Sequence, residues 1–276
     1  MPVLVTLAMG VSTLLVAIYI DPVMHLVTIA GVIMLMLSAF LANFFRDPDR
    51  PIPRDEGIMV SPADGHVMFV VRERATGRRP SKDEMDGCDN DPLTGDWHPE
   101  PCADPLEFTT EQRWEKVESG DESDDDCWRV AVFMSPLDVH VNRSPEAGTI
   151  VRMEHRTGKG MRRGPFLPAF KKESEFNERV RTVIEREDGL KVEVTQISGA
   201  VARTIVPWTS EGDVLRRGQR YGMIRVGSRV DLRVPASLFT SQVIGASAED
   251  PAYPKGQFVS AGTTILFTPN GVQESE

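Results

Sequence analysis

Three polar residues that lie far apart in the sequence, Asp64, His140 and Ser228, are of the types that together activate a serine hydroxyl. Ser228 follows Gly227 in a run, residues 222–235, whose alternation of apolar and polar residues is typical of a strand. A serine hydroxyl is a weak nucleophile at neutral pH and needs a base. His140 can be that base, and Asp64 can orient its imidazole or stabilise the charged form. The three residues therefore indicate nucleophilic chemistry at Ser228.

Each of these residues also has an ordinary structural interpretation. A Gly-Ser pair inside a strand can be a bend where glycine eases the approach of another backbone. Asp64 precedes Gly65, as turn residues often do. His140 at a strand edge could be a structural histidine. Only the combination of the three with the strand-like run favours chemistry over these alternatives.

Six segments of the chain carry a resemblance to a known family. They are residues 44–48 (Phe-Phe-Arg-Asp-Pro), 61–65 (Ser-Pro-Ala-Asp-Gly), 134–143, 177–179 (Asn-Glu-Arg), 198–203 (Ser-Gly-Ala-Val-Ala-Arg) and 222–235. In content, order and spacing they resemble the phosphatidylserine decarboxylases, in particular the short bacterial and archaeal branch. The resemblance does not cover residues 75–127. It leaves open whether the substrate is diacyl phosphatidylserine or the ether-linked archaetidylserine, which share the reacting headgroup.

The resemblance implies a pyruvoyl cofactor that the chain makes from its own Ser228. The hydroxyl would attack the Gly227 carbonyl, and elimination and hydrolysis would leave a β chain, residues 1–227, and an α chain, residues 228–276. Glycine at position 227 suits this step because it lacks a Cβ and tolerates backbone strain. The substrate amine would then form a Schiff base with the carbonyl of residue 228 and lose carbon dioxide. The expected assembly is an α/β heterodimer from one precursor, with a higher oligomer left open.

His140 is also our candidate for the proton donor during turnover. Here the chain departs from the longer bacterial enzymes, which carry His-x-x-His where this sequence has His140-Val-Asn-Arg143. Either His140 serves both cleavage and turnover, or Arg143 takes over part of the task. Arg143, Arg203 and Arg229 are candidates to hold the phosphodiester or carboxylate of the substrate. The alternative for any single arginine is a solvated surface position.

Two other classes of function compete with the decarboxylase. A membrane-anchored serine hydrolase could use Ser228, His140 and Asp64 without self-cleavage, but the Gly-x-Ser-x-Gly elbow of such enzymes is absent. A noncatalytic lipid-binding or carrier module would need a lysine at a hairpin tip, where this chain has Arg216 and Arg217. Neither alternative accounts for all six segments.

The first 45 residues predict a membrane-anchoring helical hairpin. Residues 2–20 and 22–45 carry no charge, and each run is close to the length that spans a bilayer. Arg46, Arg50 and Arg54 follow directly, which places the body on the cytoplasmic face by the positive-inside rule. The alternatives are a buried helix pair or a hairpin that enters only one leaflet. A cleaved signal peptide is disfavoured because no basic residue precedes the first run.

Residues 46–276 predict a β-rich α+β decarboxylase domain with barrel-sandwich-like hairpin units. Apolar alternation indicates strands at residues 65–71, 129–134, 149–154, 191–197 and 201–206. One soluble helix is expected near residues 173–186. With 276 residues, of which 41% are apolar, the chain can bury one substantial core or two small ones.

Charge is concentrated in an acidic insert at about residues 75–127. Residues 81–127 hold 17 Asp and Glu against 3 Lys and Arg, a balance of −14, so the rest of a chain of net charge −10 carries +4. We expect the insert to project into solvent, away from an anionic membrane that the basic body suits. Cys88, Cys102, Cys127 and His98 lie in it, but no Cys-x-x-Cys pair supports zinc. We expect no metal and no nucleic acid.

Overall fold

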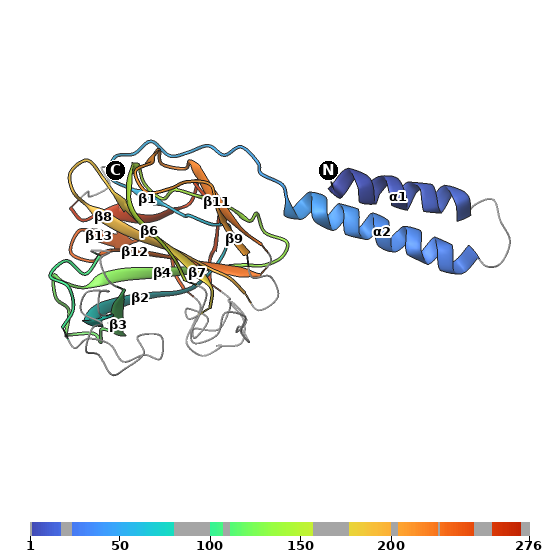
Figure 1. The fold of residues 1–276 in the computed structure, drawn as a ribbon. Helices are drawn as coiled ribbons and strands as arrows, with labels where there is room; N and C mark the ends of the chain where they lie inside the picture. The colour runs from blue at the N-terminus through green and yellow to red at the C-terminus, as the bar shows by residue number, and fades with distance from the viewer. Residues whose placement is uncertain are drawn as a thin grey trace, which may run out of the picture. The chain divides into compact units, whose positions relative to one another are not determined.

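A computed structural model describes residues 2–17, 24–79, 100–106, 111–156, 177–199, 204–225, 227–245 and 256–271. The chain divides into two compact units. The first comprises Met1–Pro48 with Pro136–Val139, and the second comprises Asp49–Ser135 with His140–Glu276. Figure 1 shows helices in the first unit and strands in the second.

The first unit contains the helices α1 (Pro2–Ala17) and α2 (Met24–Phe44). Gly10 lets the two helices approach closely, because a Cβ at this position would lie 3.1 Å from Leu35 Cγ. In α2, residues Leu26–Phe44 are long and apolar enough to cross a bilayer. The apolar stretch of α1, Leu4–Thr13, is shorter. The exposed apolar side chains of α2, such as Leu26 and Met36, indicate association with a membrane.

The second unit consists of antiparallel sheets. The main sheet has nine strands in the order β10-β6-β7-β8-β12-β4-β2-β14, with β3 paired to β2. Its strands are β2 (Gly65–Arg78), β3 (Gln112–Lys116), β4 (Cys127–Met134), β6 (Gly148–Arg156), β7 (Arg179–Glu185), β8 (Lys191–Ile197), β10 (Val214–Leu215), β12 (Ser228–Pro235) and β14 (Phe258–Val259).

Two smaller sheets of three strands complete the unit. One has the order β1-β15-β13, with β1 (Met59–Val60), β13 (Phe239–Ser241) and β15 (Ile265–Pro269). The other has the order β5-β11-β9, with β5 (Val141–Arg143), β9 (Thr204–Pro207) and β11 (Arg220–Arg225). β9 and β11 pair as an antiparallel hairpin, as the sequence predicts. No sheet closes into a barrel among the residues that the structure describes.

The two faces of the main sheet differ in chemistry, and both are buried. Side chains alternate between the faces of a strand, so β12 places Ser228, Val230 and Leu232 on one face. This face, the core face, packs with apolar residues of β4, β7 and β8 such as Val132, Ile184 and Val194. The other face carries Arg229, Asp231 and Arg233 of β12, with Arg129 of β4, Glu193 of β8 and Arg181 of β7. We term it the ionic face.

The β-rich α+β fold is confirmed, and strands occur at the predicted positions. The helix expected near residues 173–186 is wrong for its described part, because Arg179–Glu185 is strand β7. The alternation of Val180, Thr182 and Ile184 with charged Arg179 and Arg181 suits a strand between a core and an ionic face. Residues 173–176 lie outside the described part of the chain.

The expectation that the acidic insert projects into solvent is wrong for part of residues 111–127, whereas residues 118–122, 124 and 125 are exposed as expected. Part of this stretch is strand β3, which pairs with β2. Asp126 is buried, and its two carboxylate oxygens accept hydrogen bonds from Arg72 Nε and Arg74 Nε at 2.7 Å each. Arg72 and Arg74 of β2 thus hold a carboxylate of the acidic insert inside the protein, although its sequence neighbourhood predicts exposure to solvent. Residues 80–99, with Cys88 and His98, and residues 107–110 lie outside the described part.

Candidate functional site

Ser228 is the first residue of β12, and it lies where the chain passes from one sheet to another. β11 ends at Arg225 in one small sheet, and β12 begins at Ser228 in the main sheet. Gly227 makes the link with φ +60°, a left-handed conformation that favours glycine. Apart from Gly227 and its two neighbours in the chain, no atom lies within 4 Å of the position that a Cβ would occupy on Gly227. The glycine therefore provides both the backbone turn and open space on this side of the Gly227–Ser228 link.

The Ser228 side chain is fully buried on the core face. Its Oγ contacts Met134 Sδ at 3.6 Å, on the residue that faces it across the β12–β4 pair. A thioether sulfur is a weak acceptor, so the hydroxyl is held in position without a strong hydrogen bond to it.

His140 is fully buried and directly precedes β5. Its carbonyl accepts a hydrogen bond from Ile224 N at 3.2 Å, in the strand that leads to Gly227 and Ser228. The next residue but one, Asn142, donates through Nδ2 to the same Met134 sulfur, at 3.7 Å, that Ser228 contacts. The segment that carries His140 and the segment that carries Ser228 therefore meet at Met134.

A pair of buried amides lies beside the serine and was not expected from the sequence. Gln196 Nε2 donates to Asn142 Oδ1 at 2.8 Å, and both side chains are fully buried. Gln196 Oε1 and Ser198 Oγ have no hydrogen-bond partner among the described residues. The sequence does hold a signal for Gln196, because it shares a strand face with Val192 and Val194, where a core residue is otherwise apolar.

Asp64 lies in the turn before β2 and is buried. Its Oδ2 is 2.6 Å from Arg50 Nη2, and its Oδ1 accepts a hydrogen bond from Ala261 N at 2.7 Å. The turn reaches the His140 segment through the backbone, since Arg143 N donates to Pro62 O at 2.9 Å. The carboxylate thus ties together three stretches of chain around the end of β4.

The three arginines proposed for substrate binding have different surroundings. Arg143 is buried and donates through Nη1 to Gly218 O at 3.0 Å. Arg229 is fully buried on the ionic face, where Nε and Nη2 each lie 2.6 Å from an oxygen of Asp231. This bidentate pair commits the Arg229 guanidinium to the sheet. Arg203 lies outside the described residues.

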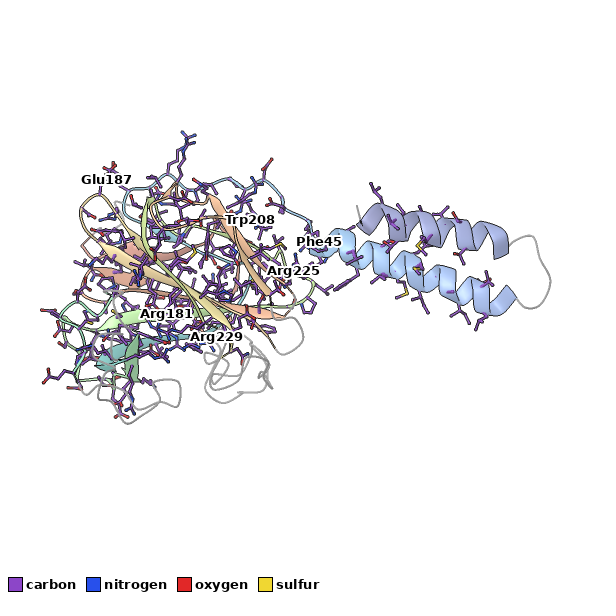
Figure 2. The ribbon with its side chains drawn as sticks, viewed as in Figure 1. Phe45, Arg181, Glu187, Trp208, Arg225 and Arg229 are labelled. Carbon is purple, nitrogen blue, oxygen red and sulfur yellow. The ribbon has the colours of Figure 1, made fainter. Side chains whose placement is uncertain are left out.

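The ionic face borders a cleft of about 410 Å³, which is lined by residues of β2, β3, β4, β7, β8 and β12. Its lining holds six basic side chains against three acidic ones, together with Phe69 and Trp114. Figure 2 labels two arginines of the face, Arg181 of β7 and Arg229 of β12. The cleft lies on the opposite face of the sheet from the Ser228 hydroxyl, so it is not the cavity in which that hydroxyl reacts.

Glu193 is the central acid of the ionic face. Arg181 Nη2 and Arg233 Nη1 each lie 2.5 Å from one of its oxygens. Burial alone would raise the pKa of this carboxyl, but the charges and hydrogen bonds of the two arginines outweigh burial and hold its pKa at about 2. Glu193 is therefore ionised at neutral pH and neutralises part of the arginine charge inside the protein.

Metal ligands do not gather in the described part of the chain. No group of three or more His, Cys, Asp and Glu side chains in it could hold an ion. Cys127 is buried in β4, and burial raises the pKa of its thiol to about 12. This thiol is consequently protonated at neutral pH, which does not suit a metal ligand.

Comparison with known proteins identifies the family. The sequence profile of the phosphatidylserine decarboxylases matches residues 37–267. The chain belongs to the phosphatidylserine decarboxylase family. That match includes Asp64, His140 and Ser228 and confirms the resemblance found in the sequence. No solved structure matches the chain.

Relatives of this phosphatidylserine decarboxylase family member are named as proenzymes. The "Phosphatidylserine decarboxylase proenzyme" of Erythrobacter litoralis is 39% identical over 83% of this chain and 74% of its own length. The proteins of the same name from Novosphingobium aromaticivorans and Nitratidesulfovibrio vulgaris are 38% and 37% identical. They cover 87% and 86% of this chain, and 75% and 82% of their own lengths.

Proposed function

We propose that this protein is a carboxy-lyase that converts the serine headgroup of a phospholipid to ethanolamine, through a pyruvoyl group made by self-cleavage between Gly227 and Ser228. The observation that carries the proposal is the junction itself. A buried serine begins a central strand directly after a glycine in a left-handed conformation. The family names, which describe proenzymes, support a precursor that is processed.

The cleavage needs only groups of the chain and one water molecule. Ser228 Oγ attacks the Gly227 carbonyl carbon, the C–N bond breaks, and an ester replaces the amide. Loss of the Ser228 α-proton then expels the Gly227 carboxylate and leaves dehydroalanine at position 228. Its enamine becomes an imine, and water hydrolyses the imine to the pyruvoyl group and ammonia. The open space beside Gly227 and the buried position of Ser228 both suit this attack.

We assign the base of this step to His140. Its segment and the Ser228 segment share contacts with Met134, and its backbone is hydrogen-bonded to the strand that leads to the junction. Asp64 has an indirect role in this step, because its carboxylate binds Arg50 and Ala261 and so holds the turn beside β5 in place. Asn142 and Gln196 keep the surroundings of the hydroxyl polar inside a closed core.

The residues present also fit a pyruvoyl group at position 228 after the break. Ser228 to Pro235 pair along their whole length with β4, so residue 228 keeps its place when the Gly227 link is gone. The pyruvoyl carbonyl supplies the electron sink that decarboxylation of an amino acid headgroup requires. His140 then donates the proton to the substrate Cα, and Arg143, tied to Gly218 at one nitrogen, offers its charge to the phosphodiester or carboxylate.

The chemistry is the same for diacyl phosphatidylserine and for archaetidylserine, because the reacting atoms lie in the headgroup. We further propose that the catalytic unit lies on the cytoplasmic face of the cell membrane. Arg46, Arg50 and Arg54 directly follow an apolar helix long enough to span the bilayer, which favours this orientation. Protease protection in right-side-out and inverted vesicles tests the orientation: the unit should be digested only in inverted vesicles.

The decisive experiment is mass spectrometry of the purified full-length protein, with decarboxylation assayed in parallel. We expect two chains, with residues 228–276 of the 30.6-kDa precursor as a fragment of about 5 kDa that begins with a pyruvoyl group. Ser228→Ala should remain one chain and release no carbon dioxide. Ser237→Ala, an exposed serine nine positions later, is the matched control and should behave as wild type.

A competing function is a serine hydrolase that uses the same three residues without self-cleavage. It predicts an unbroken chain that hydrolyses esters. An intact chain with an ordinary Ser228 that still decarboxylates the lipid would overturn the proposed cofactor.

A further inference from the structure

The loop Pro136–Val139 connects β4 to His140 in sequence, yet it belongs to the compact unit formed by the apolar helices. Asn43, in the last turn of α2, donates through Nδ2 to Leu137 O at 3.2 Å. The oxygen of the same amide accepts a hydrogen bond from Arg46 Nη1. Both ends of the Asn43 amide are therefore occupied, and the loop is attached to the end of the helix.

The loop presents an apolar side chain that is mostly exposed. Leu137 is 66% exposed, and Phe45, directly after α2, is 46% exposed. Phe45 packs edge-on against Phe44, with ring centroids 5.1 Å apart. Figure 2 labels Phe45 at the C-terminal end of α2. Arginine directly after the end of an apolar helix is typical of the boundary between a bilayer and water on the cytoplasmic side.

We propose that Pro136–Val139 is a membrane-contact loop, with Leu137 inserted among the lipids at the boundary where α2 ends. The occupant of this surface is the bilayer, because the loop is hydrogen-bonded to the last turn of a helix of membrane-spanning length and apolarity and belongs to the same compact unit. The location of the loop in the membrane does not depend on the proposed function, but its effect on catalysis does. Residue 140 is three positions from Leu137 and a chain extends at most about 3.6 Å per residue, so the His140 backbone is held near the headgroups.

The consequence is that the enzyme acts on a lipid whose chains stay in the membrane. A headgroup would reach the reacting segment without full extraction of the lipid, which would expose two hydrocarbon chains to water at about 0.8 kcal/mol per CH₂. Because Asn43 of α2 is hydrogen-bonded to Leu137, the depth of α2 in the bilayer would also fix the depth of the loop. Leu137 is thus a positioning residue that sets where the reaction occurs, without contact to the reacting atoms.

Spin labels test the location of the loop directly. Single cysteines at Leu137, at Val32 in the middle of α2 and at Leu238 in the second unit are labelled in full-length protein whose native cysteines are replaced. Val32 and Leu238 are 45% and 50% exposed, so all three labels are tolerated at the surface. The protein is placed in vesicles of phosphatidylcholine and phosphatidylglycerol. Collision with oxygen reports lipid, and collision with a water-soluble nickel complex reports water.

We expect the label at position 137 to collide with oxygen as the label at 32 does, and the label at 238 to collide with nickel. If 137 behaves as 238 while 32 lies in lipid, the loop proposal is wrong and the anchor stands. If 32 also collides with nickel, the anchor and the loop proposal both fail. A label at 137 that reaches neither reagent would mean that protein, such as a second copy of the chain, covers the loop, which also overturns the proposal.

Kinetics separate the loop from the proposed chemistry. Leu137→Asp is compared with Leu238→Asp on two substrates, long-chain phosphatidylserine in vesicles and short-chain phosphatidylserine as dissolved monomers. Leu137→Asp should lower kcat/KM on vesicles by about tenfold, because a carboxylate enters lipid poorly, and should leave turnover of monomers and self-cleavage unchanged. Leu137→Phe should restore activity on vesicles.

Equal losses on both substrates would indicate structural damage and would overturn the loop proposal, as would full activity of Leu137→Asp on vesicles. Absence of monomer turnover by the wild-type protein would instead contradict the proposed function.

Discussion

At the residue scale, the junction between Gly227 and Ser228 combines a backbone conformation that favours glycine with a weakly bound serine hydroxyl. The left-handed φ of Gly227 is open to glycine and costly for other residues. The Ser228 hydroxyl donates to a thioether sulfur, so the proposed attack on the Gly227 carbonyl would break only a weak hydrogen bond. Both features concern the precursor, since the proposed cleavage would consume the serine.

Gly227→Ala tests the conformational role of the glycine. We expect self-cleavage to slow by about tenfold, because a Cβ disfavours φ +60° by about 1–2 kcal/mol and obstructs the approach of Oγ to the carbonyl. Gly212→Ala is the matched control: its φ is +91°, no atom lies within 4 Å of its Cβ position, and it lies in a turn between β9 and β10. Timed gels of freshly synthesised protein measure both rates. Equal rates for the two variants would show that the conformation of Gly227 is irrelevant to cleavage.

At the element scale, the main sheet has a cluster of buried ion pairs on one face and an apolar core on the other. Arg129 and Arg229 flank Asp231, and Arg181 and Arg233 flank Glu193. Two of these guanidiniums also lie over the Phe69 ring, that of Arg129 at 4.9 Å and that of Arg229 at 5.3 Å from its centroid. Buried charges of this kind are costly when one partner is missing. The stability of the sheet that holds Ser228 therefore depends on every partner in these ion pairs being present.

Glu193→Gln should destabilise the fold by about 3 kcal/mol at neutral pH, because it leaves Arg181 and Arg233 without their shared carboxylate. The pKa of Glu193 is lowered from 4.5 to about 2, so its contribution is present above pH 4.5 and is lost as the pH falls toward 2. The variant should accordingly show a flatter dependence of stability on pH in this window.

Urea unfolding of detergent-solubilised protein from pH 7 to pH 2 measures the effect. The control is Glu187→Gln, which alters an exposed carboxylate in the β7–β8 turn, labelled in Figure 2. It should change neither the free energy of unfolding nor its dependence on pH. Wild-type and Glu193→Gln curves that run parallel below pH 4.5 would contradict the low pKa.

Gly65→Ala should prevent folding of the turn that carries Asp64. Gly65 has φ +144°, and a Cβ there would lie 2.0 Å from Phe133 O in the neighbouring strand. The backbones of β2 and β4 would have to separate next to the Ser228 junction, so we expect little folded protein and no cleavage. Gly189→Ala, at φ +84° in an open turn, should fold and cleave. The yield of soluble, membrane-extracted protein and gel analysis decide between these outcomes.

At the scale of the whole molecule, the two proposed products of cleavage are interleaved. The α chain would contain β12, β13, β14 and β15, and three of these pair with strands of the β chain. β12 lies between β4 and β8, β14 pairs with β2, and β15 pairs with β1. Figure 1 shows β12 and β4 as neighbours inside the same sheet. A broken backbone would therefore leave the core intact.

We expect the two chains to migrate together in size-exclusion chromatography in mild detergent, in equal amounts, and to separate only when the protein is unfolded. The reason is that release of β12 would expose its apolar face and break hydrogen bonds with two neighbouring strands. Elution of the short chain by itself from native protein would contradict the sheet order described above.

Much of this protein follows from local sequence. Alternation along residues 228–235 predicts a strand and, with it, that Ser228 and Arg229 point to opposite faces. Uncharged runs predict the two helices, and the motifs around Asp64, His140 and Ser228 predict the family. These features are local, because the repeat of apolar residues within one segment, or one short motif, is enough to predict each of them.

Only the tertiary structure decided which side chains meet. Residues 179–185 became a strand instead of a helix because β6 and β8 lie on either side and the ionic face accepts Arg179 and Arg181. Asp64 met Arg50 and Ala261, and Met134 came to face Ser228, through pairings between stretches up to 197 residues apart. Such contacts depend on the register of distant strands, and the register is set by burial of the whole core, which no short segment encodes.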